Sequence, residues 1–143
     1  MSQKYLENAM AELGVHETPG TVATQRIIEY DKHTTLKATS DEIAWCSAFA
    51  NFVVATSGDV GTGSAAARSW LDWGKVLDAP APGCIVVIDR KDANNPIAAH
   101  VTFYVCDDTD KNGIQCIGGN QGDAVKMSIF PKSKVLSYRD VKQ

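Results

Sequence analysis

The sequence lacks the marks of several large classes of protein. Its four cysteines form no Cys-x-x-Cys pair and its three histidines are scattered, so we expect no metal site. No apolar run is long enough to cross a membrane, and no cluster of Lys and Arg marks a membrane-binding patch, so stable membrane association is not expected. With a net charge of −3 and no basic stripe, the chain is not expected to bind nucleic acid.

A secretion signal is also missing from the start of the sequence. The segment 1–8 is polar and charged where a signal peptide would carry an apolar core. We therefore expect the protein to be made in the cytoplasm. Any action outside the cytoplasm would need release through a holin-type pore or delivery by a secretion system.

What the sequence does contain is an ordinary globular composition, with 44% apolar and 22% charged residues among 143. This length suits one domain, residues 1–143, with one core. Apolar residues at helical spacing predict helices over 3–13, over 22–31, from Cys46 to the stop signal Ser57-Gly58, and over 65–73 after the capping residue Ser64. Apolar and β-branched runs predict strands over 84–88, 100–106, 114–117, 125–129 and 135–138. This order predicts an α+β fold, with N-terminal helices packed on a C-terminal antiparallel β-sheet.

Cys46 stands where a loop carrying Asp41 and Glu42 passes into an apolar helix. The free N–H groups and the positive dipole end of a helix N-terminus favour a thiolate. Such a position can lower the pKa of a cysteine from ~8.5 into the range ~3.5–7.5. We therefore expect Cys46 to be a nucleophile, provided that a base lies beside it.

His100 and Asn120 are the candidate partners of Cys46. His100 opens the predicted second strand and Asn120 follows the third, and these two strands should be antiparallel neighbours, so both residues should lie at one edge of the sheet. If the helix begins at the same edge, Cys46 attacks a carbonyl, His100 transfers the proton and Asn120 fixes the imidazole ring. Gln121 is the neighbour that could take the third role instead.

Three blocks of sequence carry a resemblance to a known family. The blocks are Ala44-Trp45-Cys46-Ser47-Ala48-Phe49, Ala99-His100-Val101-Thr102-Phe103-Tyr104 and Gly118-Gly119-Asn120-Gln121. They resemble the signature blocks of the NlpC/P60–CHAP superfamily, and most closely those of its small single-domain members found as phage lysis proteins. The segments 17–20, 61–64 and 69–74 resemble further blocks of that subgroup. The resemblance implies a papain-like fold and cleavage of a peptide or amide bond in peptidoglycan by Cys46, His100 and Asn120, without a cofactor.

The same resemblance offers residues for substrate binding. Glu17 and Asp41 could bind a substrate amine or shape the cleft, although helix-end capping or loop hydrogen bonding is the favoured explanation for both. Trp45 stands where many members of the family carry Asp, in a region that touches substrate. The three tryptophans, Trp45, Trp70 and Trp73, either stack on glycan or pack in the core, and packing is expected for at least two. Gln121 completes the set of candidate substrate-binding residues.

Two local patterns have simpler explanations than the functional ones. The segment 108–113 copies the first half of a calcium loop, but Gly119 stands at the twelfth position, where a bidentate Glu is required, so we expect a polar hairpin turn. Cys106 and Cys116 flank this turn and could meet across the hairpin, but free buried thiols are expected in a protein made in the cytoplasm.

The sequence thus predicts a monomeric, endolysin-like peptidoglycan hydrolase that acts in the periplasm or cell wall. Two alternatives stay open: a secreted effector or toxin that acts as a cysteine amidase, deamidase or acyltransferase, and a cell-wall-binding module without catalytic activity. Which bond of peptidoglycan is cut does not follow from the sequence.

Overall fold

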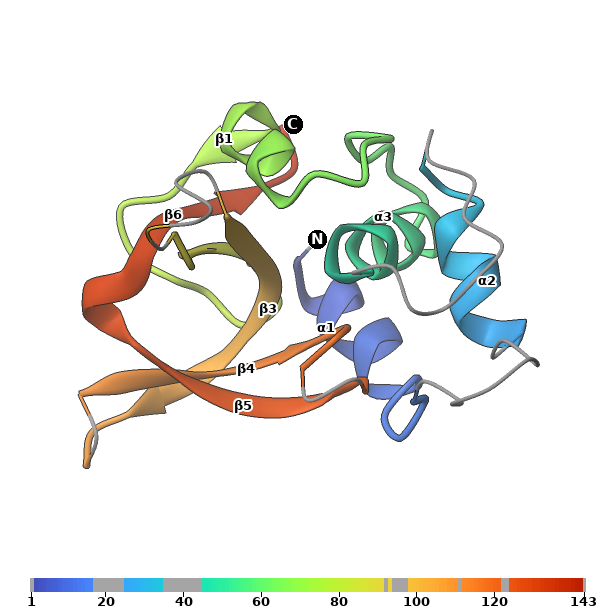
Figure 1. The fold of residues 1–143 in the computed structure, drawn as a ribbon. Coiled ribbons are helices and arrows are strands. Elements are labelled where there is room, and N and C mark those ends of the chain that lie inside the picture. Colours follow the sequence, from blue (N-terminus) through green and yellow to red (C-terminus); the bar gives the residue numbers. More distant parts are fainter. Residues whose placement is uncertain are drawn as a thin grey trace.

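The computed structural model describes residues 2–16, 25–34, 45–91, 93, 98–110, 112–121 and 124–142. Within these ranges, helices dominate the first part of the chain and strands the second (Figure 1). The elements in chain order are α1 (Ser2–Met10), α2 (Gln25–Asp31), α3 (Cys46–Thr56), η1 (Ala67–Asp72), β1 (Lys75–Val76), β2 (Ile85–Asp89), β3 (Ala99–Asp108), β4 (Gly113–Gly118), β5 (Lys126–Pro131), η2 (Lys132–Lys134) and β6 (Val135–Asp140). None of the described helices is long and apolar enough to span a membrane.

The strands form one antiparallel sheet in the order β1-β6-β2-β3-β4-β5. β5 and β6 lie on opposite sides of the three central strands, yet only the three residues of η2 join them. So short a link forces the sheet to curl until β5 and β6 approach each other at one end, as the ribbon in Figure 1 shows. The sheet therefore has a convex outer face and a concave inner face.

The two faces of the sheet carry separate apolar clusters. Because side chains alternate along a strand, every second residue of β2, β3 and β4 lies on the outer face of the sheet, which is the face covered by the helices. The outer face packs against α1, α3 and η1 through Ile85, Val87, Val101, Phe103 and Ile117. The inner face encloses Cys84, Val86, Ile88, Tyr104, Ile114 and Cys116, with Phe130, Val135 and Tyr138 against them.

Helix α3 is the centre of the helical layer. Its residues from Cys46 to Val54 are all buried, because α2 covers one side and β3 the other. A helix that is apolar all round has to be enclosed in this way. The chain leaves it at Gly58, whose φ of 93° suits the left-handed turn that ends a helix, and the N–H groups of Ser57 and Gly58 bond the last carbonyls.

The coarse prediction of an α+β fold is confirmed, with differences at the ends of elements. The segment 65–73, expected as an α-helix capped by Ser64, is the 3₁₀ helix η1, which begins at Ala67. The Ser64 hydroxyl instead closes a tight turn by accepting the N–H of Ala66. The two-residue strand β1 carries no sequence pattern of its own and was not expected.

Candidate functional site

Cys46 is the first residue of α3, as the sequence predicts, but its sulfur is enclosed. The residue is 7% exposed and belongs to the core cluster. The backbone N–H groups of Val101 and Ser47 donate hydrogen bonds to the sulfur. Val101 lies on β3, so the start of α3 touches the sheet at the start of this strand.

Burial raises the pKa of the Cys46 thiol above its ordinary value. Several groups lower this pKa, among them the N–H groups of Val101 and Ser47 and the positive charge of Arg90. The loss of thiolate hydration on burial has the larger effect, so the pKa is raised. The sequence-based expectation of a lowered pKa at this helix start is therefore wrong for the structure described here, in which the resting group is a neutral thiol.

The site is built on an open edge of the sheet. β3 begins at Ala99, but its pairing with β4 begins only at Phe103, so the stretch 99–102 has a neighbour, β2, on one side only. The turn that follows β4 fills this gap, and glycines let it approach closely. A Cβ at Gly119 would lie 2.7 Å from Phe49 Cβ and from the Trp45 ring, and one at Gly118 would lie within 2.6 Å of Thr102 and Gln121.

His100 is held by Gln121 on the inner face of the sheet. Its Nε2 lies 3.0 Å from Gln121 Oε1, and the residue is 1% exposed. The amide nitrogen of Gln121 donates to the carbonyl of Lys126 at 2.7 Å and to that of Cys116 at 3.4 Å, which leaves Oε1 facing His100. The Thr102 hydroxyl donates to the same Oε1 at 2.7 Å.

This network fixes the tautomer of His100. An amide oxygen only accepts hydrogen bonds, so the proton of the neutral imidazole must sit on Nε2. Nδ1 therefore carries a lone pair and is the nitrogen that can act as a base. Burial lowers the pKa of His100 to about 4, opposed by the Gln121 hydrogen bond and reinforced by the charge of Arg90, so the ring is neutral at pH 7.

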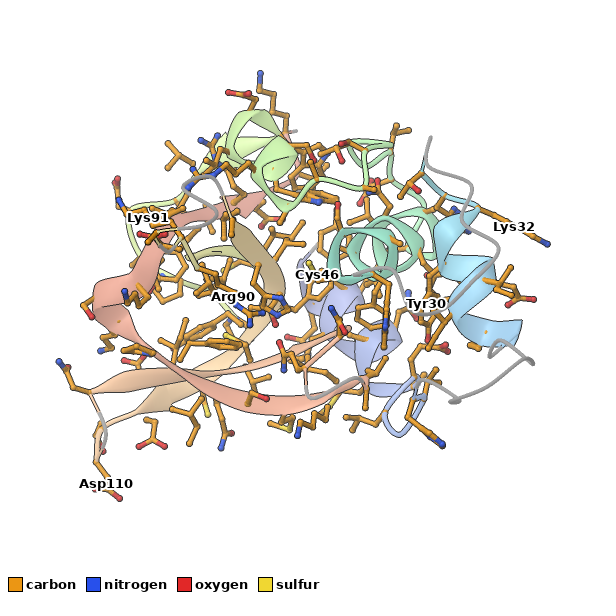
Figure 2. The ribbon with its side chains drawn as sticks, viewed as in Figure 1. Tyr30, Lys32, Cys46, Arg90, Lys91 and Asp110 are labelled. Carbon is orange, nitrogen blue, oxygen red and sulfur yellow. The ribbon has the colours of Figure 1, made fainter. Side chains whose placement is uncertain are left out.

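Cys46 and His100 are neighbours through the backbone of β3. Of the N–H groups that bond the sulfur, the one on β3 belongs to the peptide joining His100 to Val101. Arg90 acts electrostatically on both groups, and Figure 2 shows Cys46 at the start of α3 with Arg90 on its sheet side. Among the described residues no hydrogen bond joins the sulfur to the imidazole; the ring nitrogen that is bonded is Nε2, to Gln121.

The other predicted residues lie in different surroundings. Asn120 occupies the left-handed region, with φ 58°, and lines a cavity beside His100 without bonding the ring. Trp45 and Trp70 are fully buried, and Trp73, half-buried, donates to the carbonyl of Val60. Glu17 and Asp41 lie outside the described residues. Of the two candidates for the residue that orients the imidazole, Gln121 is thus the one that bonds it.

The cavity beside His100 has a volume of about 370 Å³. Its walls come from the end of β2, the start of β3, the turn after β4, and β5 with η2. The apolar part of the lining consists of Ile88, Phe130 and Pro131. The polar part consists of Asp89, Arg90, His100, Asn120, Gln121, Ser128 and Lys134. Reasoning from the sequence did not predict that Arg90 and Lys134 line this cavity. Arg90 could have been found, because it directly follows a buried strand whose antiparallel neighbour opens with His100.

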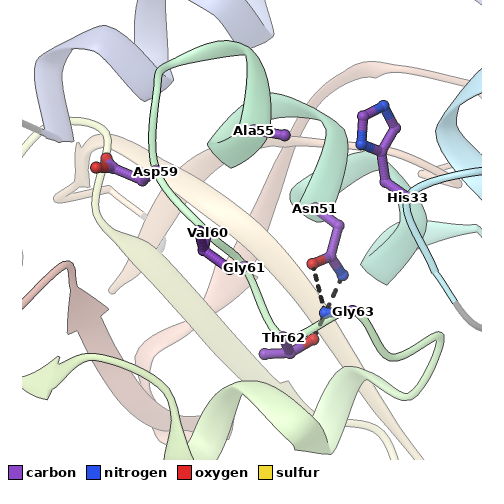
Figure 3. A pocket seen from close by; sticks show the side chains of 8 residues that line it. All are labelled: His33, Asn51, Ala55, Asp59, Val60, Gly61, Thr62 and Gly63. Carbon is purple, nitrogen blue, oxygen red and sulfur yellow. Dashed lines mark hydrogen bonds between the residues drawn. The ribbon is translucent and has the colours of Figure 1, made fainter.

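A second cavity, of about 360 Å³, lies at the other end of the helical layer (Figure 3). It is lined by His33, Asn51, Ala55 and the segment 59–63. Asn51, on α3, donates to the carbonyl of Ser47 and accepts the N–H of Gly63 at 2.9 Å. The Asn51 side chain thus holds the glycine-rich connection against α3.

Two further predictions concern the remaining cysteines and the segment 108–113. All four cysteines are free thiols, and Cys106 is exposed, whereas burial had been expected. The segment 108–113 joins β3 to β4 as the expected hairpin, with Asp108 paired to Gly113. Within the described ranges no cluster of three or more His, Cys, Asp or Glu side chains could hold a metal ion.

Comparisons with family models, curated proteins and solved structures found no match to this chain.

Proposed function

We propose that the chain is a cysteine-dependent peptidoglycan hydrolase that cleaves a peptide or muramoyl-peptide amide bond. One observation carries the proposal: a buried imidazole, fixed as the Nε2–H tautomer by Gln121, lies one peptide bond from the N–H that touches the Cys46 sulfur. The sequence blocks that resemble the NlpC/P60–CHAP superfamily support the choice of substrate and a papain-like fold.

The resting charges decide how the chemistry begins. Burial keeps Cys46 a thiol and His100 a neutral imidazole, so no ion pair exists before substrate binds. His100 Nδ1 therefore takes the thiol proton as the sulfur attacks the carbonyl carbon, which is general-base catalysis. The backbone N–H of Cys46, which lies against the sulfur at the helix start, stabilises the oxyanion.

The reaction is completed by the same two residues. The imidazolium gives its proton to the leaving amine, and a thioester on Cys46 remains. Water, deprotonated by His100, then releases the acid and restores the thiol. Each step is a proton transfer or an acyl transfer, so the proposed reaction uses no cofactor. The enzyme acts as a monomer on cell-wall peptidoglycan, after holin-type release or delivery by a secretion system.

The proposal is tested on defined muropeptides with mass analysis of the products. Wild-type protein is expected to cut one amide bond, and Cys46→Ala to lower kcat by about 10⁴-fold or more while keeping the circular dichroism spectrum. Cys106→Ala, which removes an exposed thiol, is the matched control and keeps full activity. Full activity in Cys46→Ala would end the proposal. Selective modification of a host protein, with muropeptides left intact, would support the toxin alternative instead.

A further inference from the structure

The cavity beside His100 carries positive charge that the described structure leaves unpaired. Arg90 is exposed at its rim, and Lys134 lies on η2 opposite. Among the described residues neither side chain forms an ion pair. The rim carries one carboxylate among the described residues, Asp89, which accepts the N–H of Lys91 at 2.9 Å and lies 3.8 Å from the Lys91 ammonium. The Lys91 N–H lowers the pKa of Asp89, and the charges of Lys91 and, more distantly, Lys134 act in the same direction.

Among the described residues, no carboxylate lines the interior of the same cavity. His100 is neutral, the Gln121 amide is fully used by its own network, and Phe130 and Ile88 supply apolar surface. A cavity of about 370 Å³ suits one or two peptide residues. A guanidinium at the mouth of such a cavity matches the two oxygens of a carboxylate in a planar, bidentate geometry.

We infer that this cavity binds a carboxylate group of the substrate, held by the guanidinium of Arg90 with the Lys134 ammonium as a second, weaker contact. The identity of the substrate as a cell-wall peptide rests on the proposed function, whereas the recognition of a carboxylate rests on the cavity itself. Two sources present this group: the free C-terminus of a peptide, and an acidic side chain within it.

Occupation of the cavity would also act on the reacting groups. The charge of Arg90 lowers the basicity of His100 and the pKa of Cys46. A bound carboxylate offsets that charge at both groups, so Nδ1 becomes a stronger base and the thiol a weaker acid when the cavity is filled. Because these two changes oppose each other in the proton transfer, the main gain of substrates with the carboxylate is in affinity.

Binding is measured first without catalysis, in the Cys46→Ala protein, by NMR titration. The probes are N-acetyl-alanyl-alanine, its C-terminal amide, and N-acetyl-glutamyl-alanine amide, which carries only a side-chain carboxylate. At least one carboxylate probe is expected to bind ten-fold or more tightly than the neutral amide, and the comparison of the two identifies the source. Equal binding of all three probes overturns the inference.

Variants then assign the preference to Arg90. Each substitution is made in the Cys46→Ala protein. Arg90→Gln is expected to remove the preference for the carboxylate, and Arg90→Lys is expected to keep part of it. Lys134→Gln is expected to weaken the preference by a few-fold. Lys75→Gln, which removes an exposed charge on β1, is the matched control. Thermal unfolding of each variant shows that the fold is kept, and a preference that survives in folded Arg90→Gln overturns the inference.

The two proposals fail separately. If wild-type protein cuts no muropeptide but carboxylate binding depends on Arg90, the hydrolase proposal fails and the carboxylate site stands. If wild-type protein cuts muropeptides and Arg90→Gln changes neither KM nor kcat, the carboxylate site fails and the hydrolase proposal stands.

Discussion

The two cavities of this molecule have nearly the same volume, about 360 and 370 Å³, but they use their polar groups in opposite ways. Around Asn51 the polar groups bond one another: its amide joins Ser47 to Gly63, and Asp59 accepts the Tyr5 hydroxyl. Beside His100, the part of the chain that the structure describes provides no hydrogen-bond partner for the Arg90 guanidinium or for Nδ1 of His100. Spare capacity, rather than volume, separates a candidate site from a gap between packed elements.

Among changes to the residues that line the two cavities, the largest expected effect comes from breaking the network that orients His100. Gln121→Met removes the acceptor of the Nε2–H bond, so the imidazole can adopt either tautomer. We expect kcat on a defined muropeptide to fall about 10³-fold, by analogy with the loss of a tautomer-fixing group in other triads. ¹⁵N NMR of the imidazole should show the proton shared between Nδ1 and Nε2, a change that mere loss of packing would not produce.

Asn120→Ala is the matched control for that experiment. Asn120 is the neighbour of Gln121 and lines the same cavity, but it does not bond the ring. We expect less than a ten-fold change in kcat and an unchanged tautomer. A larger loss in Asn120→Ala than in Gln121→Met would assign the third role to Asn120, as the sequence suggested first.

A change in the other cavity should affect stability and not chemistry. Asn51→Leu leaves the N–H of Gly63 without its acceptor and removes the donor to Ser47. We expect the free energy of unfolding to fall by about 3 kcal/mol, the cost of one or two unsatisfied buried groups. Urea denaturation measures this loss, and kcat per folded molecule should stay within two-fold of wild type. A selective loss of kcat in the folded variant would show that this cavity also belongs to the site.

The pH dependence of stability reports the burial of His100. Its pKa is about 4 in the folded protein and ~6.5 in an unfolded chain, so protonation favours the unfolded state. The stabilisation by the neutral ring is complete above pH ~6.5 and is lost as the pH falls towards 4, by about 2 kcal/mol at pH 5. Urea denaturation at several pH values measures the slope, and His100→Gln should remove this part of it. An imidazole that titrates near 6.5 by NMR would contradict the buried, neutral ring.

The smallest effect concerns the order in which the thiols react. Cys106 is exposed, whereas burial raises the pKa of Cys46 and raises that of Cys84 to about 11. A thiol reagent at pH 8 should therefore label one cysteine quickly, and Cys106→Ser should abolish that fast phase. Fast labelling of Cys46 in the free protein would show that its sulfur is more accessible and more acidic than the structure has it.

The sequence was sufficient for features that depend on local pattern. The apolar run after Trp45 placed Cys46 at a helix start, and the polar segment 108–113 predicted the hairpin that brings His100 and the turn after β4 to one edge. Features that depend on tertiary contact were out of reach. The choice between Asn120 and Gln121 depends on which side chain a left-handed turn directs at the ring. The packing around the start of α3 depends on how closely Gly119 lets that turn approach Trp45 and Phe49.

If the proposed function holds, the length of the three-residue link η2 sets which substrates enter the cavity without affecting the reacting groups. It sets how far β5 and β6 stand apart, and with Pro131 and Lys134 it forms one wall of the hollow whose opposite wall is the end of β2. Inserting residues there would widen the entrance and move a cation outward, while the sulfur, the imidazole and the glutamine kept their places. Natural or engineered forms of this protein that accept bulkier substrates should therefore differ first in the length of this surface connection.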